Sequence, residues 1–344
     1  MCNYSNGLAL AMALLSASLA GCGANAVAPV TVNTAITTKA VPEHIKALKD
    51  EQADARRHAA HCLWLIGAEA PEATPALLEA LHDKDGEVRR EAAQALGRTG
   101  KQDGNVLGAL LESLKDEVAT VRVTAAAALY ELHEQAKPQR QAIFPALIEA
   151  LKDNDEEVQA WSALLIGKLG SDKAAVPNLM AVLKASSARA RMNAANALAI
   201  LGPESKPAFS VLMELAKNDE NVSVRTNALL AIGGLGVEAK SAIPFLIENI
   251  KSSDAGRQYG AALALYQIGP EAKAAIPALT ELLKTEPPQE VRQAASAAID
   301  CLNGKRRPPP SPASVLSTVG RTGMTEKQMQ QMKRMMMKEQ PEKP

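Results

Sequence analysis

The chain has 344 residues, of which 47 % are apolar and only 3 % aromatic, and its formal net charge is zero. Because the net charge is zero, the protein as a whole has no electrostatic attraction to nucleic acid or to a membrane. The apolar content is supplied mainly by Ala and Leu, which favours packed helices over sheets. The four cysteines show no CxxC or Cys/His metal spacing, so neither a disulfide scaffold nor a zinc module is predicted. Charge is uneven along the chain: residues 304–344 contain nine Lys/Arg against three Asp/Glu, and residues 41–303 contain 28 basic against 35 acidic residues.

Residues 1–21 have the features of an export signal. An uncharged apolar run of thirteen residues, LALAMALLSASLA, covers 8–20 and is too short to span a bilayer, but it matches the central region of a signal peptide. The run ends in Leu19-Ala20-Gly21-Cys22, which resembles the lipobox of bacterial lipoproteins, although the preceding MCNYSNG has no Lys or Arg. The alternatives are an ordinary cleaved secretory signal and a cytosolic protein with an apolar N-terminus.

The lipobox resemblance implies cleavage before Cys22 and acylation of that residue. It therefore implies a membrane-anchored lipoprotein of the bacterial cell envelope, facing the periplasm or the exterior. Residues 22–41 are small and polar without helical periodicity, so we expect a flexible tether there.

Residues 42–303 contain an internal repeat. A thirteen-residue pattern begins at eight positions spaced by 33, 33, 37, 32, 34, 33 and 34 residues. The first residues of the eight copies are Ala55, Val88, Val121, Val158, Ala190, Val224, Arg257 and Val291. Position 5 is always Ala or Ser, position 9 is Leu or Ile, and position 13 is Gly in six copies.

Each copy predicts a helical hairpin. Positions 1, 5, 8, 9 and 12 form one apolar stripe at 3.6 residues per turn, so the copy is an amphipathic helix. Good N-cap residues stand three residues before position 1 in five copies: Asp85, Asp155, Ser187, Asn221 and Asp254. Gly at position 13 suits the end of a helix. A second, often Pro-initiated helix follows, as in PALLEALHDKD. The sequence therefore predicts an all-α fold, an α-solenoid of about seven to eight stacked hairpins.

The pattern V-R-x-x-A-A-x-A-L-x-x-x-G followed by P-x-L-x-x-x-L resembles HEAT repeats, especially the short class associated with phycobilisome lyase subunits. This resemblance covers residues 42–303 and implies an armadillo-like superhelix, a fold that serves enzymes, adaptors and binding platforms alike. Our leading hypothesis is a non-enzymatic protein–protein interaction scaffold of the cell envelope. One alternative is an accessory or lyase-like subunit that assists modification of a cofactor-bearing partner protein. Another is a membrane-associated metal-handling protein.

Position 2 is arginine in six copies: Arg56, Arg89, Arg122, Arg191, Arg225 and Arg292. We interpret these residues as a structural ladder in which each arginine pairs with an acidic group between repeats, such as Asp85, Asp155 and Asp219. The competing interpretation is a polyanion site, which the acidic body disfavours.

Position 10, opposite the apolar stripe, contains Trp64, Tyr130 and Tyr266, and we consider these rings candidate anchors for a protein partner. The alternative is packing against neighbouring helices. His58, His61 and Cys62 share one helix, but no fourth metal ligand is evident, so no metal site is predicted. No catalytic or phosphate-binding motif occurs, and no cofactor, small-molecule substrate or nucleic acid is expected. Cys62 and Cys301 belong to opposite ends of the array, so no disulfide is expected between them.

After Asn303 the repeat ends. Residues 304–324 are a Pro- and Ser-rich linker, and residues 325–344 form a basic, Met-rich tail with a short helix predicted from TEKQMQQMKRMMMKEQ. The functional interpretations of this tail are contact with anionic lipid, docking to another protein, and Cu(I) binding by thioethers. A tail without ordered structure is the remaining alternative.

Overall fold

The computed structural model describes residues 40–100, 103–170 and 172–305. Within these ranges the regular elements are helices, and strands are absent. The prediction of an all-α solenoid is confirmed. The predicted signal peptide, most of the predicted tether with Cys22, most of the predicted linker and the Met-rich tail lie outside the described residues.

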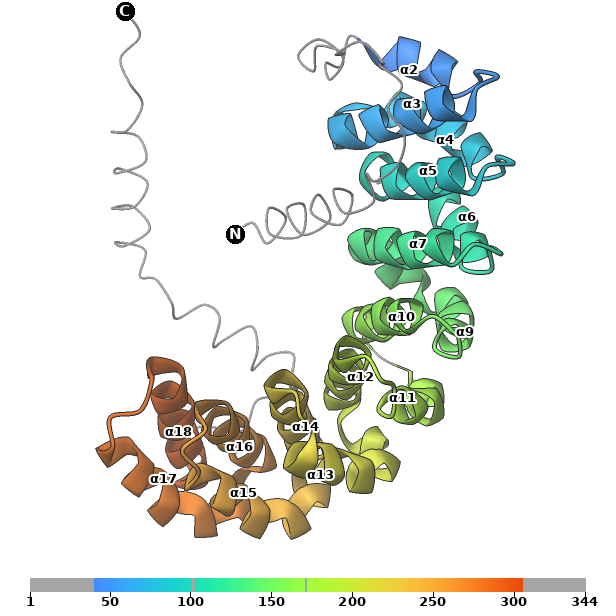
Figure 1. Cartoon of the computed structure of the whole chain (residues 1–344). Helices are drawn as coiled ribbons and strands as arrows, with labels where there is room; N and C mark the ends of the chain where they lie inside the picture. Colours follow the sequence, from blue (N-terminus) through green and yellow to red (C-terminus); the bar gives the residue numbers. More distant parts are fainter. Residues whose placement is uncertain (1–39, 101–102, 171, 306–344) are drawn as a thin grey trace, which may run out of the picture. The chain divides into compact units, whose positions relative to one another are not determined.

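The thirteen-residue pattern forms the first helix of each hairpin, and these helices make up one row. Their bounds are α3 (Ala53–Ile66), α5 (Gly86–Thr99), α7 (Ala119–Glu131), α10 (Glu156–Leu169), α12 (Ala188–Leu201), α14 (Val222–Gly234), α16 (Ala255–Ile268) and α18 (Gln289–Leu302). Each packs on the next along the row, and Figure 1 shows this first row on the inner side of the stack.

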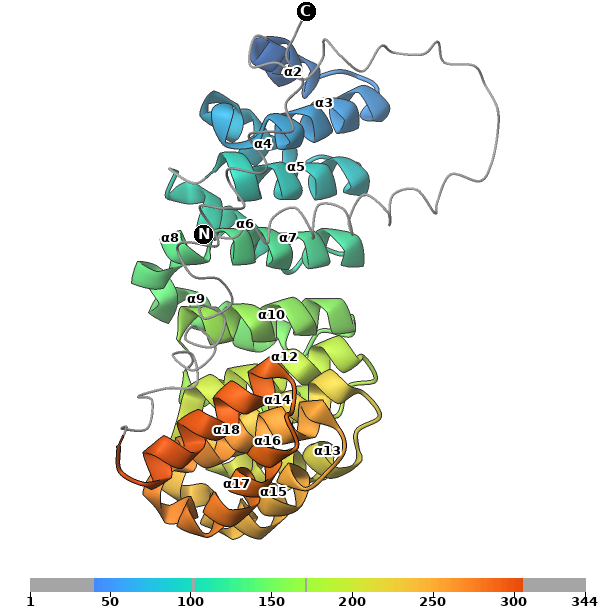
Figure 2. The same ribbon diagram turned by 90° about the vertical axis from the view of Figure 1, so that its left-hand side faces the viewer.

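The shorter second helices form a second row on the other side (Figures 1 and 2). Their bounds are α2 (Val41–Ala47), α4 (Thr74–Ala80), α6 (Asn105–Ser113), α9 (Arg140–Ala150), α11 (Val176–Val182), α13 (Phe209–Asn218), α15 (Ile243–Ile250) and α17 (Ile276–Lys284). Short 3-10 turns precede several of them: η3 (Gly67–Glu69), η4 (Pro71–Ala73), η5 (Lys137–Gln139), η6 (Lys173–Ala175), η7 (Gly202–Ala208), η8 (Gly236–Ala242) and η9 (Gly269–Ala275). The 37-residue spacing accommodates one extra turn, α8 (His133–Ala136).

The predicted caps begin the first-row helices. The Asp85 carboxylate accepts hydrogen bonds from the backbone N–H of Glu87 and Val88, and Asp155, Ser187, Asn221 and Asp254 cap their helices in the same way. These side chains satisfy N–H groups that have no partner within the helix.

Glycine at position 13 ends the first-row helices, but not always for the predicted reason. Five of the six adopt positive φ: Gly67, Gly170, Gly202, Gly236 and Gly269. Gly100 is the exception, with φ of −80°. A Cβ there would lie 2.7 Å from Val106 and 2.8 Å from the Leu96 carbonyl oxygen, so space rather than backbone conformation requires glycine at this position.

The core lies between the two rows. The side chains at positions 1, 5 and 9 of the first row are buried, except those of Ala55, Arg257 and Ile299. These helices pack on the second row, whose Leu77 and Leu147 are also buried. Small residues at position 5, including Ala92 and Ser162, are fully buried. Among the described helices, none is both long and apolar enough to cross a membrane.

Candidate functional site

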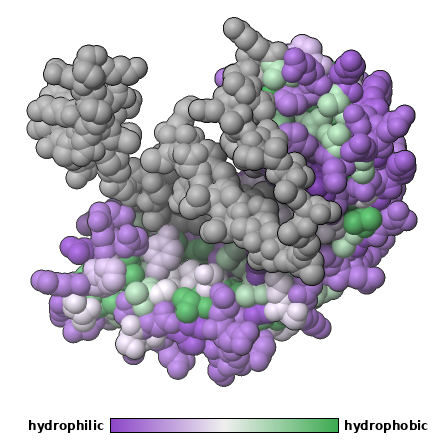
Figure 3. All heavy atoms as spheres, turned by 45° about the horizontal axis from the view of Figure 1, so that its top comes forward, coloured by the Kyte–Doolittle hydropathy of each residue, from purple (hydrophilic) through white to green (hydrophobic). Residues whose placement is uncertain are grey.

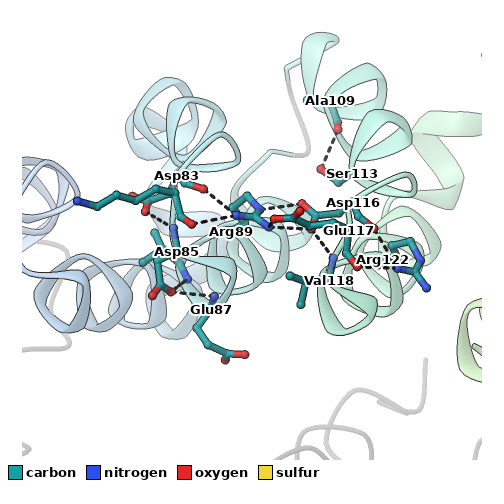
Figure 4. A network of polar contacts seen from close by, with 12 residues as sticks. Asp83, Asp85, Glu87, Arg89, Ala109, Ser113, Asp116, Glu117, Val118 and Arg122 are labelled. Atoms are coloured by element: carbon teal, nitrogen blue, oxygen red, sulfur yellow. Dashed lines mark hydrogen bonds and ion pairs between the residues drawn. The ribbon is translucent and has the colours of Figure 1, made fainter.

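The position-2 arginines link neighbouring repeats. Arg89 donates from Nε and Nη2 to both carboxylate oxygens of Asp116, at 2.7 and 2.9 Å. Its Nη1 donates to the carbonyl oxygen of Asp83 in the preceding inter-repeat loop, at 2.9 Å. Figure 4 shows that the guanidinium lies between the two loops. One side chain thus fixes the loops before and after its own hairpin.

The same geometry recurs along the stack. Arg56, Arg122 and Arg191 make two-point contacts with Asp83, Asp153 and Asp219 respectively. Arg225 contacts Asp254 through one nitrogen at 3.0 Å, and Arg292 donates to the Pro287 carbonyl oxygen at 3.3 Å.

The predicted partners of the ladder are partly wrong. Asp219 is an arginine partner, but Asp85 and Asp155 are not: the arginines contact Asp83 and Asp153, two residues earlier in each loop. Asp85 and Asp155 are occupied as helix caps. The carboxylate of Asp83 also accepts the Asp85 N–H at 2.9 Å, which holds it toward the guanidinium.

The pair of Arg89 and Asp116 is held in the charged state by its hydrogen bonds. Burial alone would raise the pKa of Asp116, but hydrogen bonds from the Arg89 guanidinium and the Val118 N–H outweigh it and hold that pKa below its usual value. The pKa of Arg89 is raised, chiefly by its hydrogen bond to Asp116. Since the side chains of this pair are only 11 and 12 % exposed, they are not free to bind a polyanion.

Two copies have glutamine in place of the ladder arginine. Gln159 and Gln258 each donate to a carbonyl oxygen of the preceding loop, Asp153 and Ser252 respectively. At the first of these junctions Glu156 connects the repeats instead. Its carboxylate accepts hydrogen bonds from the backbone N–H of Ser186 and Ser187, at 2.6 and 2.8 Å.

The two histidines of α3 contact different partners and do not converge on one point. His61 Nδ1 lies 3.3 Å from the buried carboxylate of Glu91, and His58 Nε2 lies 3.5 Å from Cys62 Sγ. No group of three potential metal ligands is present in the described ranges. Cys62 and Cys301 are both buried, and neither forms a disulfide with another described residue.

The three candidate aromatic anchors do not form one track. Trp64 is half-buried beneath the Arg98 guanidinium, whose Cζ lies 4.5 Å from the ring centroid. The Tyr130 ring centroid lies 5.5 Å from that of Trp161 on the next first-row helix. Tyr266 is half-buried, and its carbonyl oxygen accepts a weak hydrogen bond from Cys301 Sγ. Trp64 and Tyr130 therefore pack against adjacent repeats while remaining partly exposed.

The sequence pattern did not predict that Trp161 contacts Tyr130 of the preceding repeat. This ring is 5 % exposed, and it lies between Tyr130 and the Arg189 guanidinium, whose Cζ is 4.4 Å from the ring centroid. Trp161 occupies position 4 of its copy, whereas the candidate anchors occupy position 10. Comparison of position 4 with position 10 of the preceding copy would have found the pair.

Sequence reasoning also missed a neutral face on the first row. Positions 3, 4 and 7 of α7, α10, α12, α14, α16 and α18 contain no charged residue. We call the half-exposed residues at these positions the neutral face: Val123, Thr124, Ala127, Leu164, Met192, Asn196, Thr226, Asn227, Tyr259, Gln293 and Ala297. Figure 3 shows white and green atoms between purple margins on the lower part of the molecule.

The first-row residues of the first two copies differ sharply from this face. The same three positions hold Arg57, His58 and His61 on α3, and Arg90, Glu91 and Gln94 on α5. The second row is also charged on its exposed side, as in the pairs Glu149–Lys152 and Glu281–Lys284. The absence of charge is thus confined to one side of the last six hairpins. Comparison of positions 3, 4 and 7 across the eight copies would have revealed this neutral face.

A family model for HEAT repeats matches residues 41–137, 144–233 and 209–300, which together make up most of the chain. The chain belongs to the HEAT-repeat family. A search of curated proteins gives no match.

Solved structures with a similar fold include an engineered protein, at 22 % identity and a TM-score of 0.58, with 83 % of this chain and 85 % of that one covered. Another is YibA of Escherichia coli, at 22 % identity and a TM-score of 0.56, with 82 % of this HEAT-repeat chain and 99 % of YibA covered. At this level of identity the likeness shows the fold alone.

Proposed function

We propose that this HEAT-repeat protein is a non-enzymatic scaffold that binds a protein partner along its neutral face. The observation that carries the proposal is the contrast between this face and the rest of the surface. Charged residues are depleted at the centres of protein–protein interfaces because each charge that loses water must be compensated. A surface of half-exposed Met, Leu, Val and Tyr side chains with interspersed amides meets that condition.

The arginine ladder is a second argument for the same proposal. Its arginines use their donors on the aspartates and loop carbonyls, so they set the position of each hairpin relative to the next. A rigid arrangement of hairpins presents the neutral face as one preformed surface, which lowers the entropy cost of binding.

Site-specific photo-crosslinking tests this function. A benzophenone amino acid at Met192 or Asn227 should capture a protein partner in intact cells of the source organism. The matched control positions are Lys217 and Glu248, which are exposed on the second row. The same adduct from 192 and 227, and not from 217 and 248, is the expected result. Adducts only from the second row would contradict the proposal.

We further propose that the scaffold is a lipoprotein of the bacterial cell envelope, anchored to the membrane through Cys22. The support is the apolar run 8–20 followed by Leu19-Ala20-Gly21-Cys22. Labelled palmitate should be incorporated into the full chain and not into the Cys22→Ala variant. Equal incorporation into both proteins would contradict the anchor. Fractionation of the same cells should place the wild-type chain with the membranes.

A further inference from the structure

We propose that the Met-rich segment 325–344 docks on the neutral face of its own chain and competes there with the partner. This inference rests on the proposed function, because it assigns a second occupant to the same surface. It is carried by the chemistry of the face, the residue spacing of the segment, and the length of chain between them.

The face and the segment are chemically matched. On α12 and α14 the face presents Met192, Asn196 and Asn227, all half-exposed and uncharged. In a helical frame Met329, Met332 and Met336 follow one another at intervals of three and four residues, so their thioether side chains share one edge. Methionine adapts to irregular apolar surfaces because its side chain is unbranched and polarisable.

Opposite net charges favour association of the segment with the repeat array. Residues 325–344 contain five basic against three acidic residues, and residues 304–324 add four basic residues and no acidic one. Residues 41–303 contain 28 basic against 35 acidic residues. Attraction between oppositely charged parts of the chain raises the local concentration of the segment near the array. The residues of the neutral face are themselves uncharged, and the charged pair beside them on α12 and α10 is Arg189 with Glu157, which neutralise one another.

The connecting chain is long enough. Nineteen residues, 306–324, lie between Lys305, the last described residue, and Thr325. Such a chain reaches at most about 65–70 Å when fully extended. Neighbouring helices pack about 8–10 Å apart, so the three steps from α18 to α12 cover roughly 24–30 Å. A segment tethered at this distance has an effective concentration on the order of millimolar.

Photo-crosslinking within the purified full chain tests the inference. A benzophenone amino acid replaces Met332 in one protein and Gln331, on another side of the helical frame, in the control. At low protein concentration, position 332 should crosslink to peptides of α12, α14 or α16 without any change in oligomer mass. Position 331 should give much less of this product. Crosslinks to a second copy, no crosslink, or equal yield from both positions would overturn the inference.

A reciprocal experiment removes the apolar edge. With the crosslinker at Asn227, the triple substitution Met329→Asp, Met332→Asp and Met336→Asp should lower the yield of adduct with residues 325–344 by about tenfold or more, because charged side chains on a buried edge must be desolvated. The triple control Gln328→Asp, Gln330→Asp and Gln331→Asp adds the same charge and should retain most of the adduct. Equal loss in both proteins would show that charge alone matters and would overturn apolar docking.

A further experiment with lipid distinguishes docking on the neutral face from binding of the segment to a membrane. The 332 crosslink should persist when vesicles of phosphatidylglycerol are added, and transfer of the label to lipid would overturn the inference. The two proposals also fail separately. If the segment docks but positions 192 and 227 capture no partner in cells, the proposed function fails and the intramolecular contact remains. If a partner is captured and the 332 crosslink is absent, only the docking of the segment fails.

Discussion

Gly233 on α14 lies directly against Ala264 on α16. A Cβ added to Gly233 would come within 2.5 Å of the Ala264 Cα and 2.5 Å of Gln267 Oε1. The same relation, position 10 of one copy against position 8 of the next, occurs between Gly97 and Ala128 at 3.1 Å. A small residue at position 10 thus permits close approach of consecutive first-row helices, which position the neutral face.

Gly233→Ala should destabilise the array by about 1–3 kcal/mol, because the added methyl group forces the backbones of α14 and α16 apart. The matched control is Gly108→Ala on α6, where a Cβ would meet nothing within 4 Å. That change should stabilise the protein by about 0.5–1 kcal/mol, since alanine loses less backbone entropy than glycine. Urea unfolding measures both effects, and similar shifts in the two variants would contradict the close contact.

Removal of a ladder arginine should be far more costly than removal of an exposed one. Arg89→Met removes the guanidinium from the Asp116 carboxylate and from the Asp83 carbonyl oxygen, leaving that carboxylate with the Val118 N–H alone, and we expect a loss of about 3 kcal/mol. Arg57→Met breaks only the exposed contact with Asp54 and should change stability by less than about 1 kcal/mol. The double variant Arg89→Met, Asp116→Asn should recover part of the loss, because no unpaired charge remains.

Stability should fall as the solution is acidified through the range where the ladder aspartates titrate. The pKa values of Asp83, Asp116, Asp153, Asp219 and Asp254 are all held below the usual value of 3.8. Each of these aspartates has a lower pKa in the folded protein than in the unfolded chain, so between the two values the unfolded chain binds more protons. The stabilisation that the charged aspartates contribute is therefore present above about pH 4 and is lost below it. Urea midpoints measured from pH 6 to pH 2 should show the decline. Asp116→Asn should make it shallower, and an unchanged profile would contradict the contribution of that carboxylate.

The repeat frame predicts the hairpins, their caps and the buried columns, because one amphipathic period recurs eight times. It does not predict which aspartate of a loop contacts the arginine. Asp83 and Asp85 are both close enough in the sequence to contact Arg56. Which of them does so depends on the backbone conformation of the loop, which the repeat pattern does not determine. Gly100 is another such position, because its requirement for glycine arises from the side chain of Val106 on the next helix. Contacts between copies, such as Tyr130 with Trp161, likewise need the packing of two helices to be known.

The different functions of Asp83 and Asp85 can be separated by the same conservative change at each position. Asp85→Asn should alter stability by less than about 0.5 kcal/mol, because asparagine caps a helix about as well as aspartate. Asp83→Asn removes the charge that the buried Arg56 contacts through two nitrogens at 2.6 and 2.7 Å, and should cost about 3 kcal/mol. Both values follow from urea unfolding at pH 7. A larger loss from Asp85→Asn than from Asp83→Asn would show that the arginine uses the cap residue instead.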